Sequence, residues 1–188
     1  ANLATYLGMI TAEVGSVSVA PIDEDNLSFY SPVNPELVIE KWNSDSWIRA
    51  ACNIGTKACE KDSPSTVILS HEFGLDPDLS LGPDEGRCKG NNFVNISAIL
   101  GEVGKRMSKN RRLLTVPILH TVLPEPNEHQ KRTIQLLGEN SDSLMVMTKV
   151  ARNFLTSDIY GIDSKKVDYI NHGVRVHDIS RKNQETNR

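Results

Sequence analysis

The sequence predicts an α/β fold: a Rossmann-like, doubly wound, mostly parallel sheet flanked by helices. Short apolar runs rich in β-branched residues alternate along the chain with longer segments of helical periodicity. The apolar runs are continuous, which is typical of strands buried on both faces of a parallel sheet. In this architecture ligands bind beyond the carboxyl ends of the strands. Functional residues are therefore expected where the strands end.

The predicted elements follow one another in strand and helix order along most of the chain. We expect strands at residues 66–70, 115–119, 143–147 and 167–170. Helical spacing is expected at about 45–61, 92–107, 128–140 and 149–161. An earlier helix and a short strand, 17–20, are expected near the start. A loop rich in Asp, Asn, Ser and Pro is expected at 21–35, and a loop rich in Gly, Pro and Asp at 75–91.

Length and charge exclude several classes of protein. The chain of 188 residues suits one domain, and its 24 acidic and 21 basic residues are mixed, with no basic stripe for nucleic acid. No apolar run approaches the roughly 18 residues of a membrane span, and the first residues lack the basic start of a signal peptide. Three cysteines without a CxxC pair suit reduced thiols. We therefore expect a cytoplasmic protein with no nucleic-acid partner and no transmembrane segment.

Polar residues gather where the predicted strands end. They are His71 and Glu72 after the first long strand, His120 and Thr121 after the second, and Asn171, His172 and Gly173 after the last. Each histidine has a structural alternative, a hydrogen bond to a loop carbonyl. His71, Glu72 and His120 are also possible metal ligands, but no HxH or HExxH spacing supports this, so no metal is expected.

Three segments resemble the N-terminal half of glycosyltransferase family 4 proteins. They are SHEFG, PILHTVLPEPN and SDSLMVMTKVARNFLTSDIYGIDSKKVDYINHGV, and the match is strongest from Thr115 to Val174. The resemblance implies a GT-B fold, in which two Rossmann-like domains face a cleft and the C-terminal one holds most of a nucleotide-sugar donor. The chain departs from the family after HEFG, where LDPDLSLGPDEGRCKG replaces a compact glycine pair.

This resemblance also implies a domain organisation. Residues 1–174 would form the acceptor-side domain, and 175–188 a polar tail or interdomain linker. Since a doubly wound domain usually begins with a strand and a glycine-rich turn, we expect that first strand and its loop to be missing, together with the C-terminal donor domain.

The family's functional positions transfer to eight residues. His120 would be catalytic, facing the donor sugar, with Thr121 orienting it. His71 and Glu72 would line the acceptor side, and Thr148 would cap a helix and bind ligand. Residues marking the crossing to the second domain would be Asn171, His172 and Gly173, for which a purely structural tight turn is the alternative.

The function expected from the resemblance is retaining transfer of a sugar from a nucleotide-sugar donor to a carbohydrate or lipid acceptor, with no further cofactor. This chain alone is expected to be inactive. The alternative is a non-catalytic Rossmann-like module that binds a ligand or partner through the same strand ends. An epimerase or hydrolase of related architecture is a third interpretation, although the HTVLPEP segment is closer to the transferases.

Overall fold

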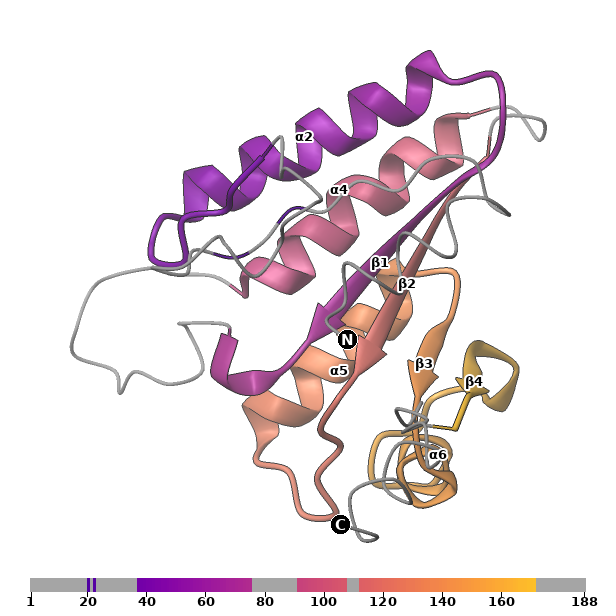
Figure 1. Cartoon of the computed structure of the whole chain (residues 1–188). Helices are drawn as coiled ribbons and strands as arrows, with labels where there is room; N and C mark the ends of the chain where they lie inside the picture. Colours follow the sequence, from indigo (N-terminus) through magenta and orange to yellow (C-terminus); the bar gives the residue numbers. More distant parts are fainter. Residues whose placement is uncertain (1–19, 21, 23–36, 76–90, 108–111, 172–188) are drawn as a thin grey trace, which may run out of the picture.

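Four parallel strands form a single sheet in the computed structural model of the chain, which describes residues 20, 22, 37–75, 91–107 and 112–171 (Figure 1). The strands lie side by side in sequence order. They are β1 (Ser65–His71), β2 (Leu113–Leu119), β3 (Leu144–Val146) and β4 (Val167–Tyr169). Every pairing is parallel, and β1 and β2 are in register from Ser65 opposite Leu113 to His71 opposite Leu119. The predicted α/β fold with a parallel sheet flanked by helices is confirmed, and it is consistent with a Rossmann-like fold.

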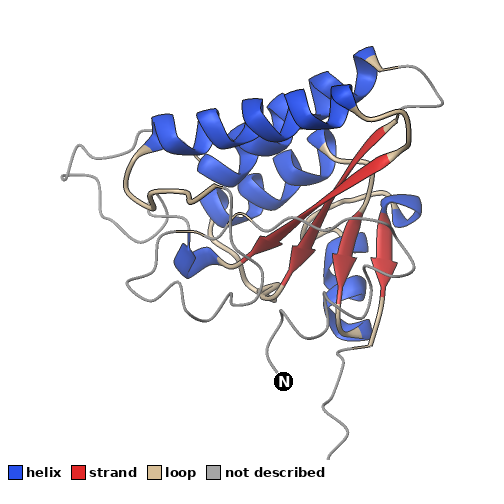
Figure 2. Cartoon of the chain, turned by 45° about the horizontal axis from the view of Figure 1, so that its top comes forward, coloured by secondary structure: helices blue, strands red, loops and turns tan. Residues whose placement is uncertain are grey.

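One helix precedes β1, and the others occupy the intervals between the strands. The α-helices are α2 (Ser44–Glu60), α4 (Asn92–Arg106), α5 (Glu128–Asn140) and α6 (Lys149–Thr156), and short 3₁₀ turns are η2 (Phe73–Leu75) and η4 (Ser164–Lys166). Parallel strands joined in sequence order by right-handed crossovers place their connecting helices on the same face. Figure 2 shows the helices gathered on one side of the four strands. A second helical layer on the other face is not among the described residues.

Side-chain caps explain where the helices begin. Asn43, Asn91, Asn127 and Thr148 precede α2, α4, α5 and α6, and each accepts a hydrogen bond from a backbone N–H of the first turn. Such a cap satisfies one of the four N–H groups that a helix start leaves without a partner. The prediction of Thr148 as a helix cap is confirmed.

Helix α6 is shorter than its sequence pattern predicts, because it ends at Thr156 and not at Gly161. The Ser157 hydroxyl donates to the carbonyl of Phe154 at 2.8 Å, and its backbone N–H also turns back to the last turn of the helix. Gly161 adopts a φ of 66°, a left-handed conformation that favours glycine. The turn directs Tyr160 into the interior, where its hydroxyl donates to the carbonyl of Leu123. A local capping interaction has therefore overridden the helical periodicity.

The two faces of the sheet differ in burial. Leu69 and Leu119 point toward the helices and are buried, whereas Thr66, Ile68 and Ser70 point to the opposite face and are exposed. The side chain of Ile68 is 61% exposed. The interior between the sheet and the helices contains aliphatic side chains that are 0% exposed. They include Leu100, Ile134, Leu137, Leu144, Val146 and Leu155. Each contributes roughly 1.5–3 kcal/mol through burial.

Several expectations lie outside the described residues. These are the early helix, most of the strand at 17–20, most of the loops at 21–35 and 75–91, His172, Gly173 and the tail at 175–188. Within the part of the chain that the structure describes, no helix is long and apolar enough to cross a membrane.

Candidate functional site

Strands β1 and β2 end at the same level of the sheet. His71 lies opposite Leu119, and the backbone N–H of His120 donates to the carbonyl of His71 at 3.1 Å. This bond continues the pairing of β1 with β2 by one residue past the end of β2. The residues that follow the two strands, Glu72 on one side and His120 with Thr121 on the other, are thereby brought next to one another.

Two hydrogen bonds between side chains connect the strand ends. The Ser70 Oγ lies 2.7 Å from the His120 Nε2, and the Thr121 hydroxyl donates to the Glu72 Oε1 at 2.8 Å. Ser70 and His120 are exposed, whereas Glu72 and Thr121 are half-buried. We call these four residues, Ser70, Glu72, His120 and Thr121, the rim cluster. It brings together one imidazole, one carboxylate and two hydroxyls where a parallel sheet binds ligands.

The rim cluster differs from the sequence prediction in one pairing. Thr121 was expected to orient His120, but its hydroxyl contacts Glu72, and the hydroxyl at His120 belongs to Ser70. Ser70 was not among the residues predicted for the site. Strand alternation was the available signal, because residues two apart on a strand share a face, which puts Ser70 on the side of Glu72.

His71 lies on the other face of the sheet, beneath the rim cluster. Its side chain is 0% exposed, and its ring packs edge-on against Phe73 and Phe93, with centroids 5.1 Å and 5.0 Å away. Neither ring nitrogen has a hydrogen-bond partner among the described residues. Burial, reinforced by the nearby His120, lowers the pKa of His71 to about 4, so the ring is neutral at neutral pH. Its predicted contact with substrate would require this packing to open.

The remaining predicted residues follow β3 and β4 at the same edge. Thr148 is exposed, and its hydroxyl accepts from the Ala151 N–H at 3.0 Å. Asn171 is exposed and accepts a hydrogen bond from the Tyr169 hydroxyl. Among the described residues, no hydrogen bond joins Thr148 or Asn171 to the rim cluster. Their roles as ligand contacts remain predictions.

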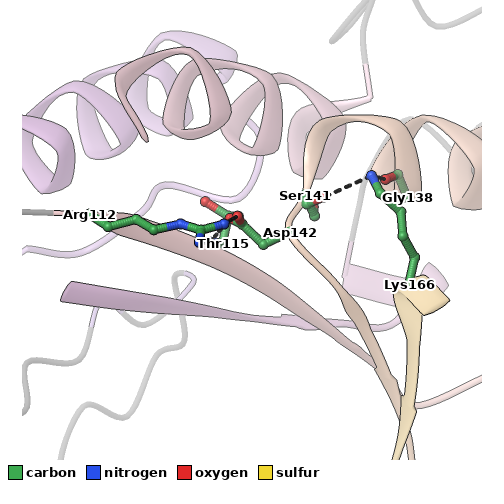
Figure 3. A network of polar contacts seen from close by, with 6 residues as sticks. All are labelled: Arg112, Thr115, Gly138, Ser141, Asp142 and Lys166. Carbon is green, nitrogen blue, oxygen red and sulfur yellow. Dashed lines mark hydrogen bonds and ion pairs between the residues drawn. The ribbon is translucent and has the colours of Figure 1, made fainter. Parts of the chain in front are cut away.

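The amino ends of the strands carry a second polar network, which the sequence analysis did not predict (Figure 3). The Asp142 carboxylate accepts from the Thr115 backbone N–H at 2.9 Å and from the Arg112 guanidinium at 2.8 Å. The Lys166 ammonium donates to the carbonyls of Gly138 at 2.6 Å and Ser141 at 3.0 Å. Figure 3 shows these side chains reaching across the start of β2 and the end of α5.

A cavity of about 260 Å³ adjoins this network, lined by residues that include Gly101, Gly104, Lys105, Arg112, Asp142 and Lys166. Each of its three cations already has a partner, since Lys105 pairs with Glu102, Arg112 with Asp142, and Lys166 with carbonyls. The carboxyl ends of α4 and α5 also lie here, and a helix carboxyl end disfavours anions. The chemistry of this cavity fits a structural junction better than a ligand site.

In the described part of the chain, no group of three or more His, Cys, Asp or Glu side chains is arranged to hold a metal ion. Comparison with known proteins identifies no family. No family model, no curated protein and no solved structure matches the chain. Function is therefore inferred from the rim cluster and from the sheet that positions it.

Proposed function

We propose that this chain is the acceptor-side domain of a retaining glycosyltransferase that uses a nucleotide-sugar donor, with a carbohydrate or lipid as acceptor. The observation that carries the proposal is the rim cluster, in which an imidazole and a carboxylate follow two paired strands and each is hydrogen-bonded to a hydroxyl from the neighbouring strand. The resemblance of SHEFG, PILHTVLPEPN and the segment ending in NHGV to glycosyltransferase family 4 supports the same class.

The rim cluster suits a hydroxyl-rich ligand. A carboxylate accepts hydrogen bonds from hydroxyl groups, and a neutral imidazole can donate one and accept another. Glu72 has one oxygen engaged by Thr121, and its other oxygen has no hydrogen bond to a described residue. Adjacent donor and acceptor groups match two neighbouring hydroxyls on a sugar ring.

His120 is assigned to the donor sugar and Glu72 to the acceptor side. In retaining transfer the bond from the anomeric carbon to the nucleotide phosphate oxygen breaks, and a bond to the acceptor oxygen forms on the same face of the sugar. The acceptor proton leaves with the departing phosphate. Positive charge develops on the sugar in between, and a preorganised polar group at the cleft edge lowers the energy of that state.

The donor pocket is proposed to belong to a second Rossmann-like domain that faces this one. A cleft needs both walls to orient the reactants and exclude water. Calorimetric titration of the 188-residue chain with uridine and guanosine diphosphate sugars should therefore show no binding tighter than about millimolar. Micromolar binding would mean that the donor half has been assigned to the wrong domain.

The decisive experiment is a transfer assay with a panel of nucleotide sugars, using the longer protein in which we propose this chain lies. Transfer with retention at the anomeric carbon is the expected result. Binding of a ligand at the rim cluster without transfer from any donor would instead favour the non-catalytic binding module.

A further inference from the structure

His120 is held by β1 at two points. Its backbone N–H donates to the carbonyl of His71, and its Nε2 lies 2.7 Å from the hydroxyl of Ser70. The two contacts come from consecutive residues of one strand, so both the backbone and the ring of His120 are tied to β1. The other ring nitrogen, Nδ1, has no hydrogen bond to any described residue.

The contact with Ser70 bears on which ring nitrogen carries the proton. In a neutral imidazole one nitrogen is a donor and the other an acceptor, and a hydrogen bond at one nitrogen sets the role of the other. A separation of 2.7 Å matches the commonest length of a bond donated by O–H, whereas it lies at the short limit of bonds donated by N–H, which run from about 2.7 to 3.2 Å. The distance therefore favours the hydroxyl of Ser70 as donor and Nε2 as acceptor.

We propose that Ser70 is a positioning residue that keeps the proton of neutral His120 on Nδ1 and so presents Nδ1–H to a hydroxyl oxygen of the bound sugar. The assignment of the ligand rests on the proposed function. The assignment of the proton rests on the contact between Ser70 and His120 alone. The two parts can therefore fail separately.

Neighbouring groups do not compete for this role. The hydroxyl of Thr121 donates to Glu72 at 2.8 Å, so among the side chains of the rim cluster only Ser70 is hydrogen-bonded to the imidazole. Ser70 and Glu72 are two residues apart on β1 and its extension and share one face. The single strand thus supplies the group that orients His120 and the carboxylate beside it.

Nitrogen NMR of the histidine-labelled chain tests the assignment of the proton, at an alkaline pH where the imidazole is neutral. We expect His120 to be mainly the Nδ1–H form in the wild type and to shift toward the Nε2–H form in Ser70→Ala. Ser70→Thr keeps the hydroxyl and should restore the wild-type signal.

Thr66→Ala is the matched control, because Thr66 is an exposed hydroxyl residue on the same face of β1 with no bond to His120. It should leave the His120 signal unchanged. The same His120 tautomer in the wild type and in Ser70→Ala would overturn the proposal, as would a wild-type ring that is mainly Nε2–H. A Ser70→Ala chain that fails to fold leaves the wild-type tautomer and Ser70→Thr to decide.

Kinetics of the longer protein test the ligand half of the proposal. Ser70→Ala should lower kcat roughly 10-fold and change KM by no more than about twofold. In metal sites, removing a group that orients a ligating histidine costs roughly 10-fold to 100-fold, and we expect the lower value here. Ser70→Thr should recover most of kcat. A shifted tautomer with unchanged kcat would overturn the role of Nδ1–H in transfer. Absence of transfer by the wild type would overturn the proposed function, and the NMR result would still decide on Ser70.

Discussion

The two ends of the sheet carry polar networks of different kinds. At the amino end, Asp142 and Lys166 bind backbone groups: the N–H of Thr115 and the carbonyls of Gly138 and Ser141. At the carboxyl end, the side chains of the rim cluster bind one another and stay partly exposed. Polar side chains that satisfy backbone groups are engaged in holding elements together. Those that bind other side chains at an exposed strand end remain accessible to a ligand.

This comparison makes a prediction for each end: substitutions at the amino end should affect stability, and substitutions at the carboxyl end should affect activity. The largest effect is expected at Gly101, where a Cβ would lie 2.6 Å from the backbone carbonyl oxygen of Asn140. That carbonyl cannot move without shifting the end of α5. Gly101→Ala should therefore lower the free energy of unfolding by about 3 kcal/mol, measured by urea denaturation.

Gly138→Ala is the matched control for this substitution. Gly138 is also a helical glycine, but the nearest atom to its Cβ would be a methyl group of Leu144 at 3.4 Å. Its cost should stay below about 1 kcal/mol, since alanine also favours the helix. Equal costs for the two substitutions would show that the junction between α4 and α5 is looser than the distances indicate.

The next effect is expected at the carboxyl end and on catalysis. In the proposed transferase, His120→Ala should lower turnover by roughly 100-fold, a loss of about 2.7 kcal/mol of transition-state stabilisation, while the melting temperature changes little. The comparison substitution is His129→Ala, on the exposed side of α5, which should leave both quantities unchanged. If the His120→Ala protein keeps full turnover, or if it unfolds, the rim cluster has a structural role like that of the polar network at the amino end.

The two histidines at this edge of the sheet differ, because His71 is buried and His120 is exposed. Because its pKa falls from about 6.5 to about 4 on folding, the unfolded chain binds more protons than the folded chain between these values. The free energy of unfolding is therefore highest above about pH 7, where His71 is neutral in both states. It decreases as the pH falls through 6.5 toward 4. The expected loss is on the order of 2 kcal/mol between about pH 7.5 and about pH 5.

Denaturation of His71→Leu at both pH values checks the assignment. Leucine has no titratable group, so most of this pH dependence should disappear, whereas His129→Leu should retain it. An unchanged pH dependence in His71→Leu would mean that His71 titrates as an accessible group and reaches solvent in the folded chain.

The smallest effects are expected within the amino-end network itself. Asp142→Ala leaves the Thr115 N–H without its carboxylate partner and should cost about 1–2 kcal/mol of unfolding free energy. Arg112→Ala removes a more exposed partner of the same carboxylate and should cost less than about 1 kcal/mol. The difference between the two variants, measured by thermal or urea denaturation, tests whether the backbone contact dominates. An Arg112→Ala cost equal to that of Asp142→Ala would show that the ion pair dominates.

The sequence by itself determined which segments became strands and helices. The apolar runs ending at His71 and at Leu119 form β1 and β2, and Thr148 caps α6 as its position predicts. The predicted end of α6 is wrong. Its periodicity continues to Gly161, but the hydrogen bonds of Ser157 end the helix at Thr156. Periodicity and capping are both local, and the sequence alone does not show which of them prevails.

The tertiary structure decided which side chains meet. Ser70 and His120 are 50 residues apart and come together because β1 and β2 pair in one parallel register. The same register, with helices on only one face of the described sheet, buries His71 and leaves His120 exposed. Side-chain direction along a strand follows from local alternation, but the face that is covered and the residues placed opposite depend on contacts between distant segments.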